Sequence, residues 1–217
     1  MCGSGAGSCV AATDMTGLVL AGGQSRRWGG IDKSWVRLTG RPLVQHVSER
    51  LAAQSAAVWI STNRDPAPFL ALADAVLADD WLDGRGPLAG IATALRRIPT
   101  PWLLVAPVDS PLLPLNLGSQ LGIAALREGR LLATVDDGEY LQPAFLLIHR
   151  DLAGALVHAV DQGVRRLGAW VQAQHPARVD ARAAAWGDQL RGANNGAELD
   201  ALRALIGELG DDFDGGR

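Results

Sequence analysis

The sequence predicts an α/β fold: a three-layer α/β/α arrangement around a mostly parallel, Rossmann-like sheet. Three observations support this prediction. Short apolar runs alternate with helical patterns, the apolar runs are continuous, and a glycine-rich loop follows the first of them. Continuous apolar strands are typical of parallel sheets that helices cover on both faces. Ligands of such sheets bind outside the carboxyl ends of the strands, so functional residues are expected in the loops that follow them.

Six apolar runs are expected to form strands: 18–21, 58–61, 75–77, 102–106, 131–135 and 144–148. Helices are expected at 42–54, 87–97, 115–128 and 152–161, and another from Asn194 or Asn195 to Ile206. In 42–54, Leu43, Val47 and Leu51 recur at helical spacing. The leading proline of that segment suits a first helical turn.

Length and composition favour one enzyme domain. The chain has 217 residues, 48% of them hydrophobic, and a formal net charge of −3. We expect residues 15–208 to form a single domain, with 1–14 as a disordered leader and 209–217 as a flexible tail. A mildly acidic chain is a poor general binder of nucleic acid, so an anion site must be local.

Membrane and metal-scaffold classes are also disfavoured. No apolar stretch approaches the ~20 residues of a membrane span. Cys2 and Cys9 are too few for a zinc site or a disulfide scaffold. We therefore expect a reduced, cytoplasmic protein.

The loop after the first apolar run carries the strongest functional signal. It reads Ala21-Gly22-Gly23-Gln24-Ser25-Arg26-Arg27-Trp28-Gly29-Gly30-Ile31-Asp32-Lys33. Glycines let backbone N–H groups approach an anion, and the arginine and lysine side chains supply fixed positive charge. The pattern predicts a cradle for a polyphosphate; the alternative is a surface loop whose cations face water. Its spacing fits neither a Walker loop nor a dinucleotide fingerprint.

Acidic residues follow two later strands. Asp109, in Pro-Val-Asp-Ser-Pro, follows the run 102–106 and is placed either to hold Mg²⁺ or to cap a helical turn. Asp79 and Asp80 follow the run 75–77. Shortly afterwards, Gly-Pro-Leu-Ala-Gly at 86–90 opens a predicted helix, whose N-terminus favours an anion or a carbonyl group.

These motifs resemble those of the molybdenum cofactor guanylyltransferases, the MobA-type family of Rossmann-like nucleotidyltransferases. The glycine loop is similar to the signature L-A-G-G-x-S-x-R-x-G-x-D-K, with Trp28 in place of Met and an extra Gly30. The segment 86–90 and the Asp109 motif also match. Near the C-terminus, 192–199 resembles N-x-N-T-P-E-x-L, with Gly192 in place of the first Asn and Asn-Gly in place of Thr-Pro. The resemblance covers about residues 16–205.

The resemblance implies transfer of GMP from GTP to molybdenum-molybdopterin, with pyrophosphate as the leaving group and Mg²⁺ as the cofactor. It implies catalytic roles for Lys33, Arg27 and Asp109, with Asp109 as the metal ligand. The implied nucleotide contacts are Leu20, Ala21, Gly22, Gly23, Ser25, Arg26, Lys33, Asn63, Asp79, Gly86, Pro87, Leu88, Gly90 and Asp109, with Asp80 as the alternative to Asp79. The implied pterin-substrate contacts are Gln142, Pro143, Arg165, Arg166 and Asn194.

For several of these residues a purely structural role stays open. Asn63 is also suited to a turn, Arg165 and Arg166 to a solvated helix face, and Asn194 to a helix N-cap. We also expect a monomer that makes transient contact with molybdenum-cofactor insertion and delivery proteins, and the charge and hydropathy predict no binding to nucleic acid or membrane.

Two other functions are weighed against this one. A sister nucleotidyltransferase would use CTP or another acceptor, but such enzymes often read Leu-Ala-Ala-Gly where this chain has Leu-Ala-Gly-Gly at 20–23. A catalytically inactive homologue would bind the nucleotide without turnover, although Lys33 and Asp109 are both retained.

Overall fold

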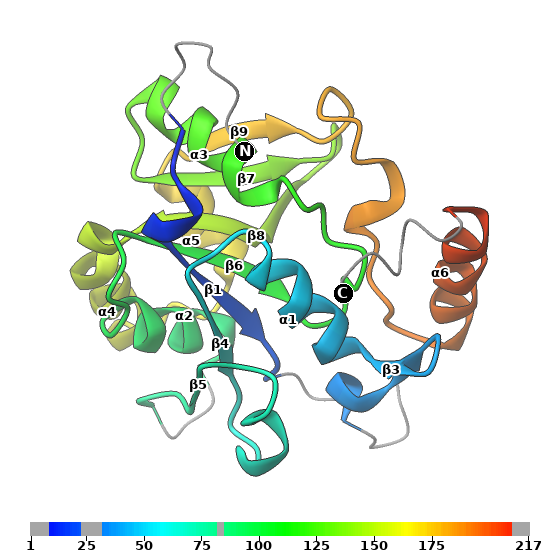
Figure 1. The fold of residues 1–217 in the computed structure, drawn as a ribbon. Coiled ribbons are helices and arrows are strands. Elements are labelled where there is room, and N and C mark those ends of the chain that lie inside the picture. Colours follow the sequence, from blue (N-terminus) through cyan, green and yellow to red (C-terminus); the bar gives the residue numbers. More distant parts are fainter. Residues whose placement is uncertain (1–8, 23–31, 82–84, 210–217) are drawn as a thin grey trace.

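The computed structural model describes residues 9–22, 32–81 and 85–209, and Figure 1 shows their fold. Seven strands form one sheet in the order β5-β4-β1-β6-β8-β7-β9. In chain order they are β1 (Met15–Leu20), β4 (Ala57–Ser61), β5 (Ala75–Leu77), β6 (Trp102–Pro107), β7 (Leu132–Asp136), β8 (Leu141–His149) and β9 (Ala177–Asp180).

The sheet is mostly parallel, as the sequence predicts. β1 pairs in parallel with both β4 and β6, β4 with β5, and β7 with β9. β8 runs antiparallel to both of its neighbours, β6 and β7. A short turn joins β7 to β8, and a connection of that length permits only antiparallel pairing. β1 lies where the strand order reverses, which is the usual position of a ligand crevice.

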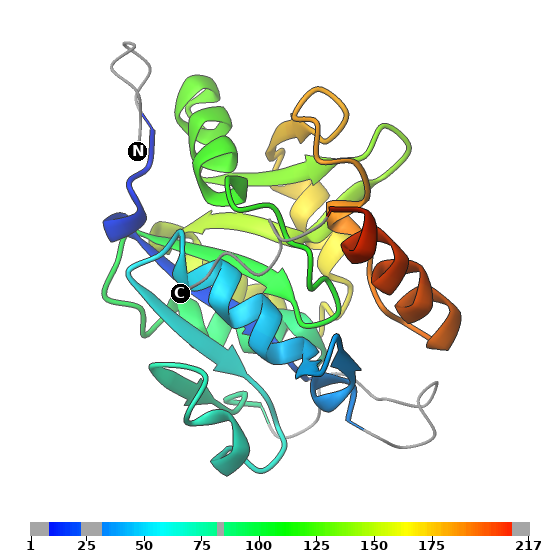
Figure 2. The same cartoon turned by 45° about the vertical axis from the view of Figure 1, so that its right-hand side comes forward.

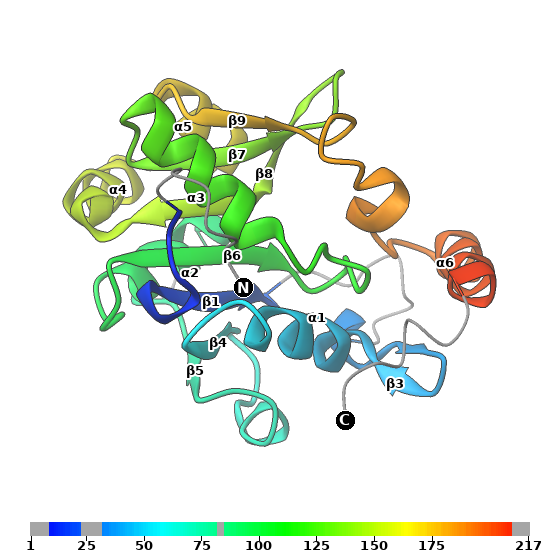
Figure 3. The ribbon, with the colours of Figure 1, turned by 45° about the horizontal axis from the view of Figure 1, so that its top comes forward.

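Helices cover both faces of the sheet. They are α1 (Leu43–Ala52), α2 (Pro87–Leu95), α3 (Leu117–Glu128), α4 (Ala153–Asp161), α5 (Leu167–Ala173) and α6 (Gly196–Leu209). α1 and α3 pack on one face, and α2, α4 and α5 pack on the other (Figure 3). Successive strand side chains alternate between the two cores: Leu18 packs with α2 and its neighbours, and Val19 packs with α1.

A third, smaller core lies beside the sheet. A hairpin of β2 (Arg37–Leu38) and β3 (Arg41–Pro42) precedes α1, and α6 packs beside it (Figure 2). Buried apolar side chains fill this contact: Leu38, Leu43, Leu112, Ala193, Leu199 and Leu202. The third core therefore joins the segment after the glycine loop, the segment after β6 and the start of α6.

The predicted elements are present, with ends shifted by a few residues. Pro42 belongs to β3, and α1 begins at Leu43. The hairpin, α5 and β9 have no counterpart among the predictions. Cys9 is disulfide-bonded, which corrects the expectation of reduced cysteines. None of the helices in the described part of the chain has the length and apolar character to cross a membrane.

Candidate active site

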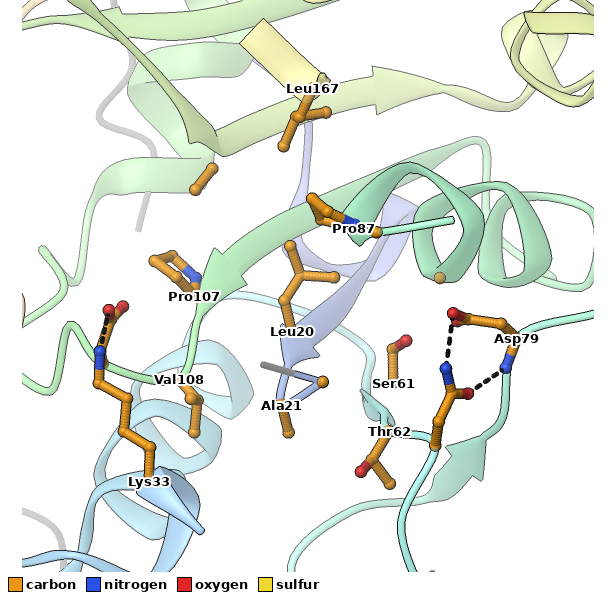
Figure 4. A pocket seen from close by; sticks show the side chains of 16 residues that line it. Leu20, Ala21, Lys33, Ser61, Thr62, Asp79, Pro87, Pro107, Val108 and Leu167 are labelled. Atoms are coloured by element: carbon orange, nitrogen blue, oxygen red, sulfur yellow. Dashed lines mark hydrogen bonds and ion pairs between the residues drawn. The ribbon is translucent and has the colours of Figure 1, made fainter. Parts of the chain in front are cut away.

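A cavity of about 370 Å³ opens at the carboxyl ends of β1, β4 and β6, against the first turn of α2 (Figure 4). This is the position that the parallel sheet predicts for a ligand. Its lining consists of Leu20, Ala21, Gly22, Lys33, Ser61, Thr62, Asn63, Asp79, Gly86, Pro87, Gly90, Pro107, Val108, Asp109, Ala144 and Leu167. In Figure 4 Lys33 and Asp79 lie at opposite ends, with Leu20 and Ala21 between them.

One end of the cavity holds a charged centre made of Lys33, Asp109 and Asn194. The Lys33 Nζ donates to Asp109 Oδ2 at 2.5 Å and to Asn194 Oδ1 at 2.8 Å. The Lys33 and Asp109 side chains are only 18% and 22% exposed, so the pair is partly shielded from water. Lys33 is the only lysine in the chain.

Three segments that are distant in sequence bring these side chains together. Lys33 opens a short 3-10 helix, Lys33–Trp35, which Asp32 caps by accepting the N–H of Ser34 at 3.0 Å. Asp109 follows β6, and its carbonyl accepts the N–H of Ala193 at 2.8 Å. The buried Ala193 belongs to the third core, so that core fixes the distance between the strand ends and α6.

Asn194 owes its place to the start of α6. Asn195 caps this helix: its Oδ1 accepts the N–H of Glu198 at 2.9 Å, and the Glu198 carboxylate accepts the N–H of Asn194 at 2.7 Å. The arrangement is a variant of the capping box in which the glutamate accepts the N–H of the residue before the cap instead of the N–H of the cap itself. The Asn194 N–H holds the pKa of the Glu198 carboxyl below its usual value, with help from the Asn194 and Asn195 side chains and the Lys33 charge.

The other end of the cavity holds a reciprocal pair of hydrogen bonds. Asn63 Nδ2 donates to Asp79 Oδ2 at 2.8 Å, and the Asp79 N–H donates to Asn63 Oδ1 at 2.9 Å. Burial raises the pKa of the Asp79 carboxyl; the bond from Asn63 opposes this shift and the nearby Asp80 adds to it. The pair fixes the loops after β4 and β5 relative to each other.

Asp79 and Asp80 are placed differently, which separates the two alternatives. Asp80 pairs with Arg97 at 2.5 Å and with Arg96 at 3.4 Å, and its N–H donates to Thr93. Its carboxylate is therefore paired with arginines at the end of α2, and Asp80 does not line the cavity. Asp79 does line it.

Gly90, in the wall of the cavity, leaves room for the side chains of Ser61 and Asp79. A Cβ built on Gly90 would lie 2.3 Å from Ser61 Oγ and 3.1 Å from Asp79 Oδ1. Any side chain there would displace Ser61 or Asp79. The second glycine of Gly-Pro-Leu-Ala-Gly therefore lets α2 approach the strand ends closely.

The Lys33 end also has the donors that Mg²⁺ prefers. Asp109 and Asn194 present a carboxylate and an amide oxygen, and in the structure both surround a cation, the Lys33 ammonium. Mg²⁺ is usually held by one or two carboxylates together with substrate phosphates and water. The described residues contain no cluster of three or more His, Cys, Asp or Glu that could bind a metal by itself. The residues thus fit a magnesium ion that is completed by a phosphorylated ligand.

Most of the expected nucleotide contacts line the cavity. They are Leu20, Ala21, Gly22, Lys33, Asn63, Asp79, Gly86, Pro87, Gly90 and Asp109. Gly23, Ser25, Arg26 and Arg27 lie outside the described residues. The side chain of Leu88 differs from the expectation: it is fully buried in the core under α2, because it points along the inner face of that helix.

Other lining residues have no counterpart among the predicted contacts: Ser61, Thr62, Pro107, Val108, Ala144 and Leu167. Ser61 ends β4 and Thr62 follows it, so the rule that predicts a role for Asp109 also applies to them. Ala144 and Leu167 come from β8 and α5, and no local sequence pattern marks them.

A second cavity, of about 470 Å³, has one lining residue, Gly192, next to the charged centre. It is lined by Asp137, Gln142, Ala181, Arg182, Gly187, Leu190, Arg191 and Gly192. A Cβ on Gly192 would lie 3.5 Å from Asp109 Oδ2 and 3.1 Å from Asn194 Nδ2. Gly192 therefore lines the second cavity and lies close to the charged centre of the first.

The expected pterin contacts do not lie together in the structure. Gln142 lines the second cavity, and Asn194 belongs to the charged centre. Pro143 packs near Gly168 of α5, and Arg166 directly precedes α5. Arg165 does not line either cavity; its carbonyl lies near Gly86, at the edge of the first.

The second cavity is charged as well. Asp137 accepts the N–H groups of Tyr140 at 2.8 Å and Glu139 at 2.9 Å, and the side-chain amide of Gln142 at 2.5 Å. These bonds, that from Tyr140 first, hold the pKa of the Asp137 carboxyl below its usual value, and the Arg182 charge acts in the same direction. Arg182 and Arg191 supply positive charge to the lining.

Comparison with known proteins places the chain among nucleotidyltransferases. Residues 17–179 match a family model described as the MobA-like NTP transferase domain. A molybdenum cofactor guanylyltransferase from Pasteurella multocida is 37% identical over 84% of this chain and 95% of its own length. Another, from Acidovorax ebreus, is 39% identical over 88% of this chain and 96% of its own length.

Solved structures agree on the fold. The molybdopterin-guanine dinucleotide biosynthesis protein A from Archaeoglobus fulgidus superposes with a TM-score of 0.71 at 23% identity, over 89% of this chain and all of that one. A CMP:2-keto-3-deoxy-manno-octonic acid synthetase, solved with CTP, gives a TM-score of 0.62 at 15% identity, over 91% of this chain and all of that one.

Proposed function

The chain belongs to the MobA-like NTP transferase family, and we propose that its function is that of its curated relatives, molybdenum cofactor guanylyl transfer. The enzyme transfers GMP from GTP to molybdenum-molybdopterin and releases pyrophosphate, which forms the guanine dinucleotide of the cofactor. The observation that supports this most is the pairing, in one cavity, of the Lys33–Asp109–Asn194 centre with the Asn63–Asp79 pair.

The reaction needs position and charge more than it needs covalent chemistry. A terminal phosphate oxygen of the acceptor attacks the α-phosphorus of GTP, one P–O bond forms, and the bond to pyrophosphate breaks. A phosphate monoester is largely ionised near pH 7, so no general base is required. The protein must bring two anions together and stabilise the charge on the leaving group.

The charged centre is suited to that task. Lys33 donates to oxygens of the α- and β-phosphates as negative charge develops on them. Asp109, with the Asn194 amide oxygen, is the site for Mg²⁺, which neutralises triphosphate charge when bound. We propose that the backbone of Gly22 and Gly23 and the side chains of Ser25, Arg26 and Arg27 complete the phosphate cradle.

The opposite end of the cavity is suited to guanine. A carboxylate accepts two hydrogen bonds side by side, and guanine offers the N1–H and the 2-amino group in that arrangement. Asp79 is proposed to make this contact, with Asn63 holding its carboxylate in place. Gly86 and Pro87 form the wall on which the base or ribose rests. Cytosine lacks the N1–H, so the same carboxylate disfavours CTP.

The acceptor is proposed to occupy the second cavity. Its phosphate would pass Gly192 to reach the α-phosphorus, while Arg182 and Arg191 neutralise its anionic groups and Gln142 binds its polar edge. Pro143, Arg165 and Arg166 lie outside the lining of the second cavity, and on the family resemblance we propose that they contact the part of the acceptor that extends beyond it. On the family resemblance we further propose a cytoplasmic monomer that passes its product to insertion and delivery proteins.

A pyrophosphate-release assay tests the proposed function. The purified chain is given Mg²⁺, molybdenum-molybdopterin and, in turn, GTP, CTP or ATP. We expect release with GTP that depends on the acceptor. Faster release with CTP would identify a sister enzyme, and GTP binding without release would identify an inactive homologue.

A further inference from the structure

Glu198, in the first turn of α6, holds the segment that carries Asn194. One carboxylate oxygen accepts the backbone N–H of Asn194 at 2.7 Å, and the other accepts Asn195 Nδ2 at 2.8 Å. Asn195 answers by accepting the N–H of Glu198 at 2.9 Å. The two residues before the helix are thus tied to it by three hydrogen bonds.

The same segment is fixed from its other side. The N–H of Ala193 donates to the carbonyl of Asp109 at 2.8 Å, and the Ala193 side chain is buried in the third core. Asn194 therefore lies between two anchors, Ala193 on the Asp109 strand end and Glu198 on α6. Its side chain extends from this pinned backbone to Lys33, 2.8 Å away.

We propose that Glu198 is a positioning residue: through the backbone of Asn194 it fixes the Asn194 amide against Lys33 and Asp109, and so sets the geometry of the phosphate centre. This inference rests on the proposed function for its catalytic consequence. Glu198 does not line the cavity, so it acts without touching the nucleotide. Phosphoryl transfer is sensitive to such placement, since a shift of about 1 Å can cost on the order of 10²-fold in rate.

The competing explanation is that Glu198 only caps α6. If Glu198 only caps α6, replacing it should lower the melting temperature and leave the folded enzyme's kinetics unchanged. If Glu198 positions Asn194, replacing it should change the kinetics even at temperatures where every variant is fully folded. The kinetics of the folded variant therefore distinguish the two roles.

Glu198→Ala is the sharpest variant, because it removes both carboxylate bonds, the one to the Asn194 N–H and the one to Asn195 Nδ2. Asp200→Asn is the matched control: it removes a carboxylate from the same end of α6, where Asp200 is exposed and pairs with Arg203 of its own helix.

Steady-state kinetics and crystal structures of both variants form the test. For Glu198→Ala we expect kcat to fall about tenfold, with the KM for GTP within twofold of wild type, because the geometry and not ground-state binding is disturbed. Asp200→Asn should stay within twofold in both. The Glu198→Ala crystal should show the Asn194 amide turned away from Lys33.

A wild-type kcat with only a lowered melting temperature would overturn the positioning role. If wild-type enzyme shows no guanylyl transfer at all, the proposed function fails, and the crystal structures alone decide this inference. An Asn194–Lys33 distance unchanged in Glu198→Ala would then refute it.

Discussion

The two cavities are built on different kinds of backbone. The nucleotide cavity lies at the ends of neighbouring parallel strands, where Leu20, Ser61 and Pro107 occupy adjacent positions of one sheet. The second cavity is formed by the β7–β8 turn and by the segment after β9, and side-chain caps hold those loops. Asp180, for example, accepts the N–H of Arg182 at 2.8 Å.

This difference matches what each cavity is proposed to do. The phosphate and guanine contacts demand fixed distances, and a sheet supplies them because each strand end is tied to its neighbours. Acceptor binding requires charge and room, which loops provide. Gly192 and Asp109 connect the two regions at one point. Changes in the first cavity should therefore affect chemistry and nucleotide choice, and changes in the second should affect only the acceptor.

The largest effect is expected for Lys33→Ala. Loss of a charge contact that strengthens in the transition state commonly lowers kcat by about 10²-fold or more. Because Lys33 is the only lysine, it also offers a direct chemical check. Pyridoxal phosphate with borohydride should label Lys33, and GTP with Mg²⁺ should protect it, as read by peptide mass spectrometry. Wild-type kcat in the variant, or labelling unaffected by GTP, would contradict this role.

The second largest effect is expected for Asp79→Asn, which should change the choice of nucleotide. The side-chain amide can accept from only one of the two guanine donors, so the preference for GTP over CTP should fall by about 10-fold to 100-fold. The pH dependence gives an independent sign. Burial raises the Asp79 pKa, so in wild type the KM for GTP should rise as the pH falls, from a higher pH than an ordinary aspartate would produce. Asp79→Asn should remove this rise.

If wild type and Asp79→Asn prefer GTP over CTP to the same degree, the base binds elsewhere. The same conclusion would follow if the acid limb of the GTP KM profile survives the substitution.

A pair of glycine substitutions probes the wall of the nucleotide cavity. Gly90→Ala places a methyl group against Ser61 and Asp79 and should raise the KM for GTP about tenfold, with 1–3 kcal/mol lost from the free energy of unfolding. Gly154→Ala, in α4, is the control. Apart from the adjacent residues and the backbone of the same helix, no atom lies within 4 Å of the Cβ position of Gly154. This variant should leave KM unchanged and stabilise by up to about 1 kcal/mol. Equal behaviour of the two variants would mean that α2 does not need its close approach.

The smallest effect is expected in the second cavity. Arg182→Ala should raise the KM for molybdenum-molybdopterin roughly fivefold, because one partly exposed charge contact is lost, and leave the KM for GTP unchanged. Arg127→Ala, on the exposed side of α3, serves as the control for lost surface charge. A rise in the GTP KM instead would show that the two cavities do not divide the substrates.

The sequence predicts the first cavity far better than the second, for a physical reason. A strand end followed by glycine or aspartate is a local pattern, and a parallel sheet brings all such ends to one edge. Asp109 and Asp79 could therefore be proposed from sequence alone, although only the structure separates Asp79 from Asp80 by pairing the latter with Arg96 and Arg97.

The second cavity depends on contacts between segments far apart in the chain. The guanidinium of Arg182 lies against Gly138, from a different strand connection. β9 and α5 are short, so no periodic pattern in the sequence predicts them. A local motif predicts substrate contacts for Arg165 and Arg166, but they line neither cavity. The role proposed for Glu198 depends on its bonds to Asn194 and Asn195, which no local motif predicts.

A crystal structure with a non-hydrolysable GTP analogue and Mg²⁺ tests the central assignment most directly. We predict the triphosphate beside Lys33, the metal on the Asp109 carboxylate and the guanine edge on Asp79. Density for the triphosphate away from Lys33 and Asp109, or a metal bound without Asp109, would contradict the assignment.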